Sequence, residues 1–194
     1  MNVAPPFVDP PWDAPLDVEA ALQHTPANAT MKGMFLDAMV EGAKKRGVTL
    51  GGARARYVPF HDYPIREHMA LLVESAHAFY PDLSLRQGLR KLGRGAHAAL
   101  IASVVGRVVW ATASDVRTAI EAMVKGYTIS VPSCRLSVIE CTDRQVTLRV
   151  EHVYWFLDSH HVGVFEGAMR AGGVDGAVRV RLSSPSDGEL SCAW

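Results

Sequence analysis

Alternating apolar and polar positions in the last third of the chain predict a β-sheet. The apolar face of the clearest strand carries Val146, Leu148, Val150, His152 and Tyr154. A shorter alternating run at 135–138 precedes it, with Asp143-Arg144 between them as a hairpin connection. Residues 178–182 and 189–194 alternate in the same way around turn residues at 185–188. We therefore expect four strands in two antiparallel hairpins.

Helical periodicity fills the rest of the chain. Between the hairpins, Asp158 or Ser159 can cap a helix that ends at Gly172-Gly173. Upstream, apolar stripes predict helices over 16–23, 30–46, 64–80, 84 to about 106, and 114–126. The strongest begins at Thr30 as N-cap, and its stripe consists of Met31, Met34, Phe35, Ala38, Met39, Gly42 and Ala43. Three glycines in the 84–106 helix predict a kink or close packing.

This order of elements predicts an α+β fold, in which a helical N-terminal half is followed by a four-stranded antiparallel sheet. The 194 residues suffice for one domain with a proper core. Five prolines among residues 1–15 exclude a helix there and predict an extended proline-rich arm. We expect a single domain over 16–194.

Composition excludes several classes of protein. Lys plus Arg equals Asp plus Glu at 20 each, so no net field favours nucleic acid or an acidic membrane surface. The sequence has no long apolar run and no secretory leader pattern, which predicts a cytoplasmic protein without a membrane span. Cys134, Cys141 and Cys192 lack metal-ligand spacing, and we interpret them as buried thiols in strands.

No pattern of residues indicates catalysis or a metal site. Nucleophile elbows, phosphate-binding loops and dinucleotide fingerprints are missing, so we expect no enzyme and no cofactor. The eight histidines have no ligand spacing, and the adjacent His160 and His161 would point about 100° apart on a helix. Asp158 beside His160 could assist a base, but capping is the plainer role. We interpret the histidines as partly buried or solvated side chains.

One local charge feature stands above the background. Residues 84–114 contain no acidic side chain, and Arg86, Arg90 and Arg94 recur every four residues with Lys91 beside them. At that spacing they form a basic ridge along one helix face. The ridge is either a solvated surface or a docking surface for an acidic protein partner.

Methionine and aromatic residues indicate either a deformable core or a pocket for an apolar ligand between the helices and the sheet. Both interpretations stay open at this point. The predicted lining consists of Met34, Phe35, Met39, Met69, Met123, Tyr154 and Phe165.

Three short motifs carry a family resemblance. They are Ala29-Thr30-Met31-Lys32-Gly33-Met34-Phe35, Leu89-Arg90-Lys91-Leu92-Gly93-Arg94, and Phe165-Glu166-Gly167-Ala168-Met169-Arg170-Ala171-Gly172-Gly173. In their order and spacing the chain, from about residue 17 onward, resembles DUF2378, a myxobacterial paralogous family of unknown function. That family is similar in turn to the superfamily of H-NOX haem domains, vinyl-reductase-type ligand-binding domains and TRAPP subunits. The resemblance implies the same helices-then-sheet fold.

The resemblance also indicates what this chain lacks. Haem members hold iron through a His on the helix just before the sheet, and grip the propionates with Tyr-x-Ser-x-Arg on a following strand. The comparable helix here, at 116–123, has no His, and the strand residues 150–154 have neither the Ser nor the Arg. Cys192 alone cannot supply the cysteine cluster of vinyl-reductase-type domains. We therefore expect no haem bound in that manner.

Two classes of function follow from the resemblance. The first is a non-catalytic regulatory domain that binds a small apolar ligand or acts as a signalling adaptor. The second is a protein-interaction module, either a homodimer or a TRAPP-like scaffold that docks an acidic partner. For the homodimer, the expected contact is the 84–106 helix and its flank, with Gly88, Gly93, Gly95, Val105, Val109 and Trp110.

Overall fold

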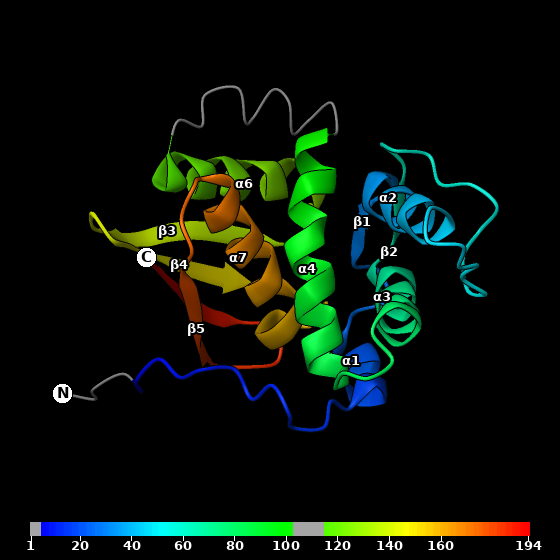
Figure 1. Cartoon of the computed structure of the whole chain (residues 1–194), viewed down its shortest axis with the longest axis horizontal. Coiled ribbons are helices and arrows are strands. Elements are labelled where there is room, and N and C mark those ends of the chain that lie inside the picture. Colours follow the sequence, from blue (N-terminus) through cyan, green and yellow to red (C-terminus); the bar gives the residue numbers. More distant parts are fainter. Residues whose placement is uncertain (1–4, 103–114) are drawn as a thin grey trace.

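A four-stranded antiparallel sheet forms one side of the molecule (Figure 1). The computed structural model describes residues 5–102 and 115–194. The strands are β3 (Arg135–Cys141), β4 (Gln145–Glu151), β5 (Ala177–Leu182) and β6 (Gly188–Ala193). Their order is β3-β4-β6-β5, so the two predicted hairpins lie side by side through β4 and β6. The predicted α+β fold is confirmed.

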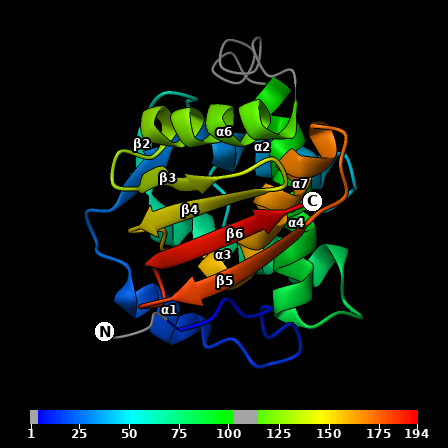
Figure 2. The ribbon, with the colours of Figure 1, turned by 90° about the vertical axis from the view of Figure 1, so that its left-hand side faces the viewer.

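The two faces of the sheet follow the alternation in the sequence. Val146, Leu148 and Val150 are fully buried beneath helices α6 (Val116–Ser130) and α7 (Val162–Ala171). The opposite face is turned to the viewer in Figure 2, with no helix in front of it. Polar residues occupy that face, where Glu189 accepts hydrogen bonds from Arg149 and Arg181.

The connection from β4 to α7 departs from the sequence prediction. The strand ends at Glu151, because His152 adopts a φ of 60° and turns the chain away. Phe156, with a φ of 62°, then begins a π-helical turn, η1 (Leu157–His161), which runs directly into α7. The predicted cap at Asp158 is wrong, since its carboxylate pairs with Arg86 instead.

The first helices form a unit apart from the sheet. Asp17 caps α1 (Val18–His24), and a two-stranded ribbon of β1 (Thr30–Lys32) and β2 (Asp62–Pro64) precedes α2 (Gly33–Lys44) and α3 (Ile65–Phe79) respectively. The prediction that Thr30 caps a helix is therefore wrong. A pairing partner more than thirty residues away extends the chain there.

Helix α4 (Leu85–Ala102) stands between the α2–α3 pair and α7 (Figure 1). The predicted close packing is confirmed at two of its glycines. A Cβ on Gly93 would lie 2.0 Å from the carbonyl oxygen of His160, and one on Gly88 would lie 3.2 Å from the Cβ of Ala76. In return, a Cβ on Gly163 of α7 would lie 2.0 Å from the carbonyl oxygen of Arg90. The two backbones therefore touch directly.

The proline-rich arm runs along the β5 edge of the sheet towards α4 (Figure 2). Val8 exchanges two backbone hydrogen bonds of 2.9 Å with Val180. Farther along, the carbonyl oxygen of Trp12 accepts a hydrogen bond from Ser84, and the Trp12 ring lies 3.9 Å from the guanidinium of Arg90. The arm thus connects the sheet edge to the start of α4.

The cysteines are unpaired thiols. Cys134 and Cys192 are buried, and burial raises the pKa of both, whereas Cys141 is half-buried. In the described part of the chain, no helix combines the length and the apolar composition needed to cross a bilayer.

The glycine contact between α4 and α7 generates the first prediction. We expect Gly163→Ala to lower the free energy of unfolding by about 3 kcal/mol or more, because the added methyl meets rigid backbone. Gly95→Ala on α4 is the matched control, since no described atom beyond the adjacent residues and backbone of its own helix lies within 4 Å of its Cβ position. It should stabilise the protein by roughly 0.5–1 kcal/mol through helix propensity. Denaturant unfolding measures both, and equal midpoints for Gly163→Ala and wild type would contradict the close contact.

Candidate functional site: an apolar cavity with two buried histidines

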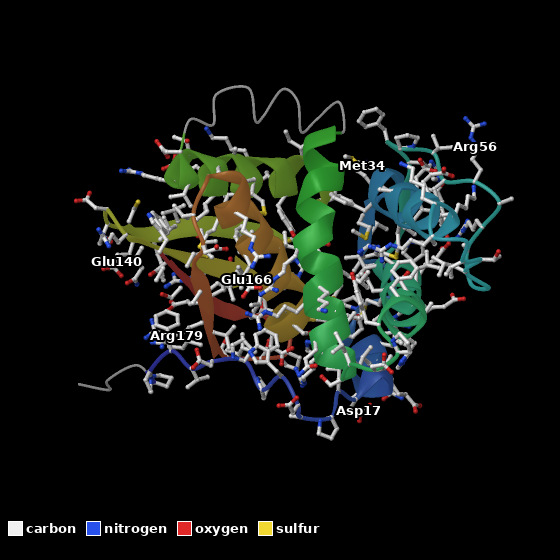
Figure 3. All side chains as sticks on the ribbon, viewed as in Figure 1. Asp17, Met34, Arg56, Glu140, Glu166 and Arg179 are labelled. Atoms are coloured by element: carbon white, nitrogen blue, oxygen red, sulfur yellow. The ribbon has the colours of Figure 1, made fainter. Side chains whose placement is uncertain are left out.

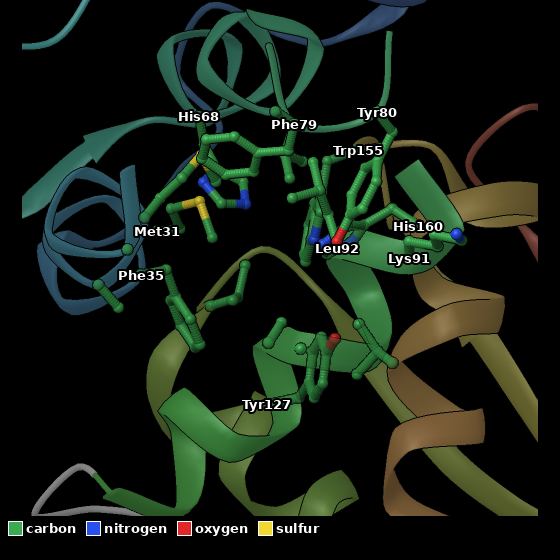
Figure 4. A pocket seen from close by; sticks show the side chains of 18 of the residues that line it. Met31, Phe35, His68, Phe79, Tyr80, Lys91, Leu92, Tyr127, Trp155 and His160 are labelled. Carbon is green, nitrogen blue, oxygen red and sulfur yellow. The ribbon is translucent and has the colours of Figure 1, made fainter. Parts of the chain in front are cut away.

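A cavity of about 210 Å³ lies where the α2–α3 pair meets α4, α6 and η1 (Figure 4). Its walls are mostly apolar or aromatic, and they include no Ser, Thr, Cys, Asp or Glu among the described residues. The lining consists of Met31, Phe35, Ala38, Met39, Gly42, Arg46, His68, Leu72, Phe79, Tyr80, Lys91, Leu92, Gly95, Ala96, Tyr127, Val131, Trp155, His160 and Val164.

The apolar stripe of α2 forms one wall. Phe35, Ala38, Met39 and Gly42 recur at helical spacing and all line the cavity. They are only half-buried, whereas Leu36 between them is fully buried in the core. The stripe that the sequence shows is therefore a cavity wall on one side and core packing on the other.

Two buried histidines belong to the lining of the cavity. His68 on α3 and His160 on η1 are both 4% exposed, and their ring centroids lie 6.2 Å apart. The Nδ1 atom of each has no hydrogen-bond partner. Burial, with a smaller contribution from His160, lowers the pKa of His68 to about 3, and burial lowers the pKa of His160 to about 3 as well. Both imidazoles are therefore neutral at physiological pH.

The π-helical turn and Gly93 together position His160. The left-handed residue Phe156 starts the turn, and the missing side chain at Gly93 lets the His160 backbone rest against α4. Behind His160, the ring of His161 packs 4.7 Å from Trp155 and 5.5 Å from Tyr127, centroid to centroid. These aromatic contacts continue the cavity wall towards α6.

The structure brings together only part of the predicted ligand pocket. Phe35 and Met39 line the cavity, and Met34 packs half-buried against the core. Met69, Met123 and Phe165 are fully buried core residues, and Tyr154 borders a different groove beside α1. Met69, Met123 and Phe165 do not line the cavity because they lie on buried faces of their helices. Tyr154 does not line it because it lies on the turn after β4.

The predicted basic ridge is not a free surface. Arg86 pairs with Asp158, and Arg90 and Arg94 both bind Glu166, whose side chain is 4% exposed. Figure 3 shows Glu166 beside α4. Burial favours a raised pKa for Glu166, but the hydrogen bonds from Arg90 and Arg94 outweigh it and hold that pKa below its ordinary value. Thus the acidic partners of these arginines lie within the chain, on η1 and α7. Lys91 instead borders the cavity.

The glycine contact predicted for a homodimer is also used internally. Gly88 faces Ala76 and Gly93 faces His160 and Val164, so neither is available to a second copy. Gly95, the third glycine of the predicted contact, makes no such internal contact with the described residues and borders the cavity. Val105, Val109 and Trp110 lie outside the described residues.

Sequence reasoning missed the polar part of the site. His68 and His160 are 92 positions apart, and no spacing rule connects them. The available signal was two adjacent histidines in residues 155–165, a stretch that is apolar except for Asp158 and Ser159, where solvated histidines are unexpected. Tyr127 and Trp155 were missed for the same reason, since their contacts are long-range.

The cavity does not fit haem held in the manner that the resemblance implies. Helix α6, which precedes the sheet, contains no His over Val116–Ser130 and contributes Tyr127 to the lining. His152-Val153-Tyr154 supplies neither the Ser nor the Arg of the propionate grip. The volume also falls below the roughly 300–1,000 Å³ of ordinary drug-sized sites. Within residues 5–102 and 115–194, no three His, Cys, Asp or Glu side chains are grouped to hold a metal ion.

The buried histidines make stability depend on pH. Both are neutral when folded but titrate near pH 6.5 when unfolded, so the unfolded state binds more protons between pH 6.5 and about 3. Stability should therefore fall as pH drops through that window, by roughly 2 kcal/mol per histidine at pH 5. We expect His160→Leu to flatten the change in thermal midpoint between pH 7 and 5. The exposed His77→Gln is the control, and an equally steep change in both variants would contradict the burial of His160.

Comparisons with known proteins agree with the overall fold. Among solved structures, an unliganded Fe(II) H-NOX protein from K. algicida is similar at 15% identity and a TM-score of 0.60, covering 84% of this chain and 96% of that chain. An H-NOX protein from S. oneidensis in the Fe(II)NO ligation state is similar at 11% identity and a TM-score of 0.58, covering 84% of this chain and 98% of that chain. A single-site mutant of T. tengcongensis H-NOX is similar at 12% identity and a TM-score of 0.54, covering 91% of this chain and 94% of that chain. At these identities the likeness shows the fold alone.

No curated protein matches the chain. The model of one family, described as a protein of unknown function (DUF2378), matches residues 25–194. That range holds α2, α3, α4, α6, α7, the whole four-stranded sheet and every residue that lines the cavity, and it leaves out the arm and all of α1. The chain, with its H-NOX-like fold, belongs to the DUF2378 family.

Proposed function

We propose that this domain is a non-catalytic regulatory module that binds a small, largely apolar molecule in the cavity. The observation that carries the proposal is the largely apolar cavity itself, whose lining includes the buried, neutral imidazoles of His68 and His160. Polar groups are few in such a lining and fix the orientation of a ligand. A ligand with an apolar body and one hydrogen-bonding group suits it.

The position of the cavity supports a regulatory role. Residues of α2 and α3 form one side and residues of α4 and η1 form the other, so a bound molecule would contact both parts of the domain. A ligand that prefers one arrangement of these parts shifts the equilibrium towards it. Apart from the phenols of Tyr80 and Tyr127, the described lining offers the neutral histidines no Ser, Thr, Cys, Asp or Glu side chain to act with, which favours binding over catalysis.

We further propose that ligand binding does not depend on haem. Axial ligation through the helix before the sheet needs an imidazole that α6 lacks, and the propionate-binding positions are changed.

Filling the cavity should abolish binding without loss of stability. We expect 1-octanol to bind the wild type and to change its tryptophan fluorescence, because Trp155 lines the cavity. Gly95→Leu should lose this binding, since its side chain would occupy open space in the lining. Gly95→Ala is the matched control and should retain it. Unchanged octanol affinity in Gly95→Leu, measured by calorimetry, would place the binding elsewhere.

Haem addition should leave no stable complex. We expect hemin titration of the purified protein to give no saturable one-to-one Soret band that survives desalting. A stoichiometric Soret band that survives desalting, and that disappears in His68→Leu or His160→Leu, would refute the proposal that ligand binding does not depend on haem.

A further inference from the structure

Two cations border the cavity at its solvent side. Arg46 follows the last turn of α2, and Lys91 lies on α4; both are exposed and both line the cavity. They approach the same ring, because the guanidinium of Arg46 is 5.9 Å and the ammonium of Lys91 is 5.3 Å from the centroid of Tyr80. The Arg46 guanidinium also lies 4.4 Å from the centroid of Phe79. These aromatic contacts hold both charges beside the mouth.

Neither cation is neutralised within the part of the chain that the structure describes. Three arginines on α4 each have a carboxylate partner, on η1 or α7. Arg46 and Lys91 have none within 4 Å among the described ion pairs, and the lining itself contains no Asp or Glu. The mouth therefore carries two positive charges with no counter-ion from residues 5–96 and 115–194.

The interior cannot hold a charge of either sign. It is lined by apolar and aromatic side chains, and the two imidazoles in it are neutral. An ion moved there would lose its hydration without a compensating partner. Any charged group of a ligand must therefore stay at the mouth. Because Arg46 and Lys91 are both positively charged, that group must be an anion.

We propose that the ligand is an amphipathic carboxylate, whose apolar chain fills the cavity and whose carboxylate lies between Arg46 and Lys91. This inference rests on the proposed function and adds the chemical class of the ligand. The volume of about 210 Å³ would hold roughly seven water-sized groups at about 30 Å³ each. That size suits a medium-chain alkanoate, with a polar group near the far end of the chain reaching His68 and His160.

A matched series of probes tests the charge separately from the chain. 8-Hydroxyoctanoate, 1,8-octanediol and 8-amino-1-octanol share a chain and a hydroxyl and differ at one end as anion, neutral group and cation. Calorimetry at low salt should rank them in that order, with the carboxylate about tenfold or more tighter than the diol. The advantage of the carboxylate should shrink as salt is raised, because both cations are exposed.

Substitutions at the mouth locate the effect. The double variant Arg46→Gln, Lys91→Gln should bind carboxylate and diol with similar affinity, while its affinity for the diol stays that of wild type. The control Arg135→Gln, Arg144→Gln removes two exposed charges from β3 and its turn and should keep the preference for the carboxylate.

The outcomes separate this inference from the proposed function. If the diol binds but the carboxylate binds no tighter, or if the double variant keeps the preference, the carboxylate assignment is overturned and the cavity still binds an apolar ligand. Tighter binding of 8-amino-1-octanol than of 8-hydroxyoctanoate would also overturn the carboxylate assignment. If none of the three probes binds, the proposed function fails and this inference fails with it.

Discussion

The direct backbone contact between α4 and α7 is the constraint on which the rest of the structure depends. Gly93 and Gly163 each face a carbonyl oxygen of the other segment, at positions where a Cβ would lie only 2.0 Å away. Around this contact, Glu166 is buried and binds both Arg90 and Arg94. A buried carboxylate is tolerated only when its partners stay in place, because breaking such a pair costs about 3–5 kcal/mol. The glycines thus set the distance between the helices, and the ion pairs fix their relative register.

The same contact determines where the cavity lies. With α4 held against η1 and α7 on one side, its other side, with Leu92, Gly95 and Ala96, faces the α2–α3 pair across the open space. The arm reinforces this arrangement from outside, since Trp12 covers the guanidinium of Arg90. The cavity is therefore the space left between the α2–α3 pair and the side of α4 that faces it.

Local patterns in the sequence sufficed for the sheet and for most helices. Val146, Leu148 and Val150 alternate as the pleat of β4 requires, and Pro64, Gly172 and the Pro185–Gly188 turn mark ends that depend on a few neighbouring residues. The N-cap prediction for Thr30 was wrong because a distant strand pairs with it. The one for Asp158 was wrong because Arg86, 72 residues away, binds its carboxylate. Periodicity records which residues are apolar and says nothing about such partners.

The candidate site was harder to predict for a related physical reason. Phe35 and Met39 have the spacing of core residues, and a cavity wall and a packed core show the same pattern in one dimension. The difference lies in whether the opposing layer reaches them. The arginines of α4 likewise looked solvated because their partners, Asp158 and Glu166, come from a later segment of the chain.

The π-helical turn at Leu157–His161 is equivalent to a single residue inserted into an α-helix. Removing one residue there would restore regular helix and rotate the chain on one side of the turn by about 100° relative to the other. Because Gly163 and Glu166 are held against α4, the segment from Trp155 to His161 would have to absorb that rotation, and the imidazole of His160 would leave the cavity. Among relatives of this chain, the length of this turn is therefore a simpler marker of a shared cavity than the identity of any one side chain in it.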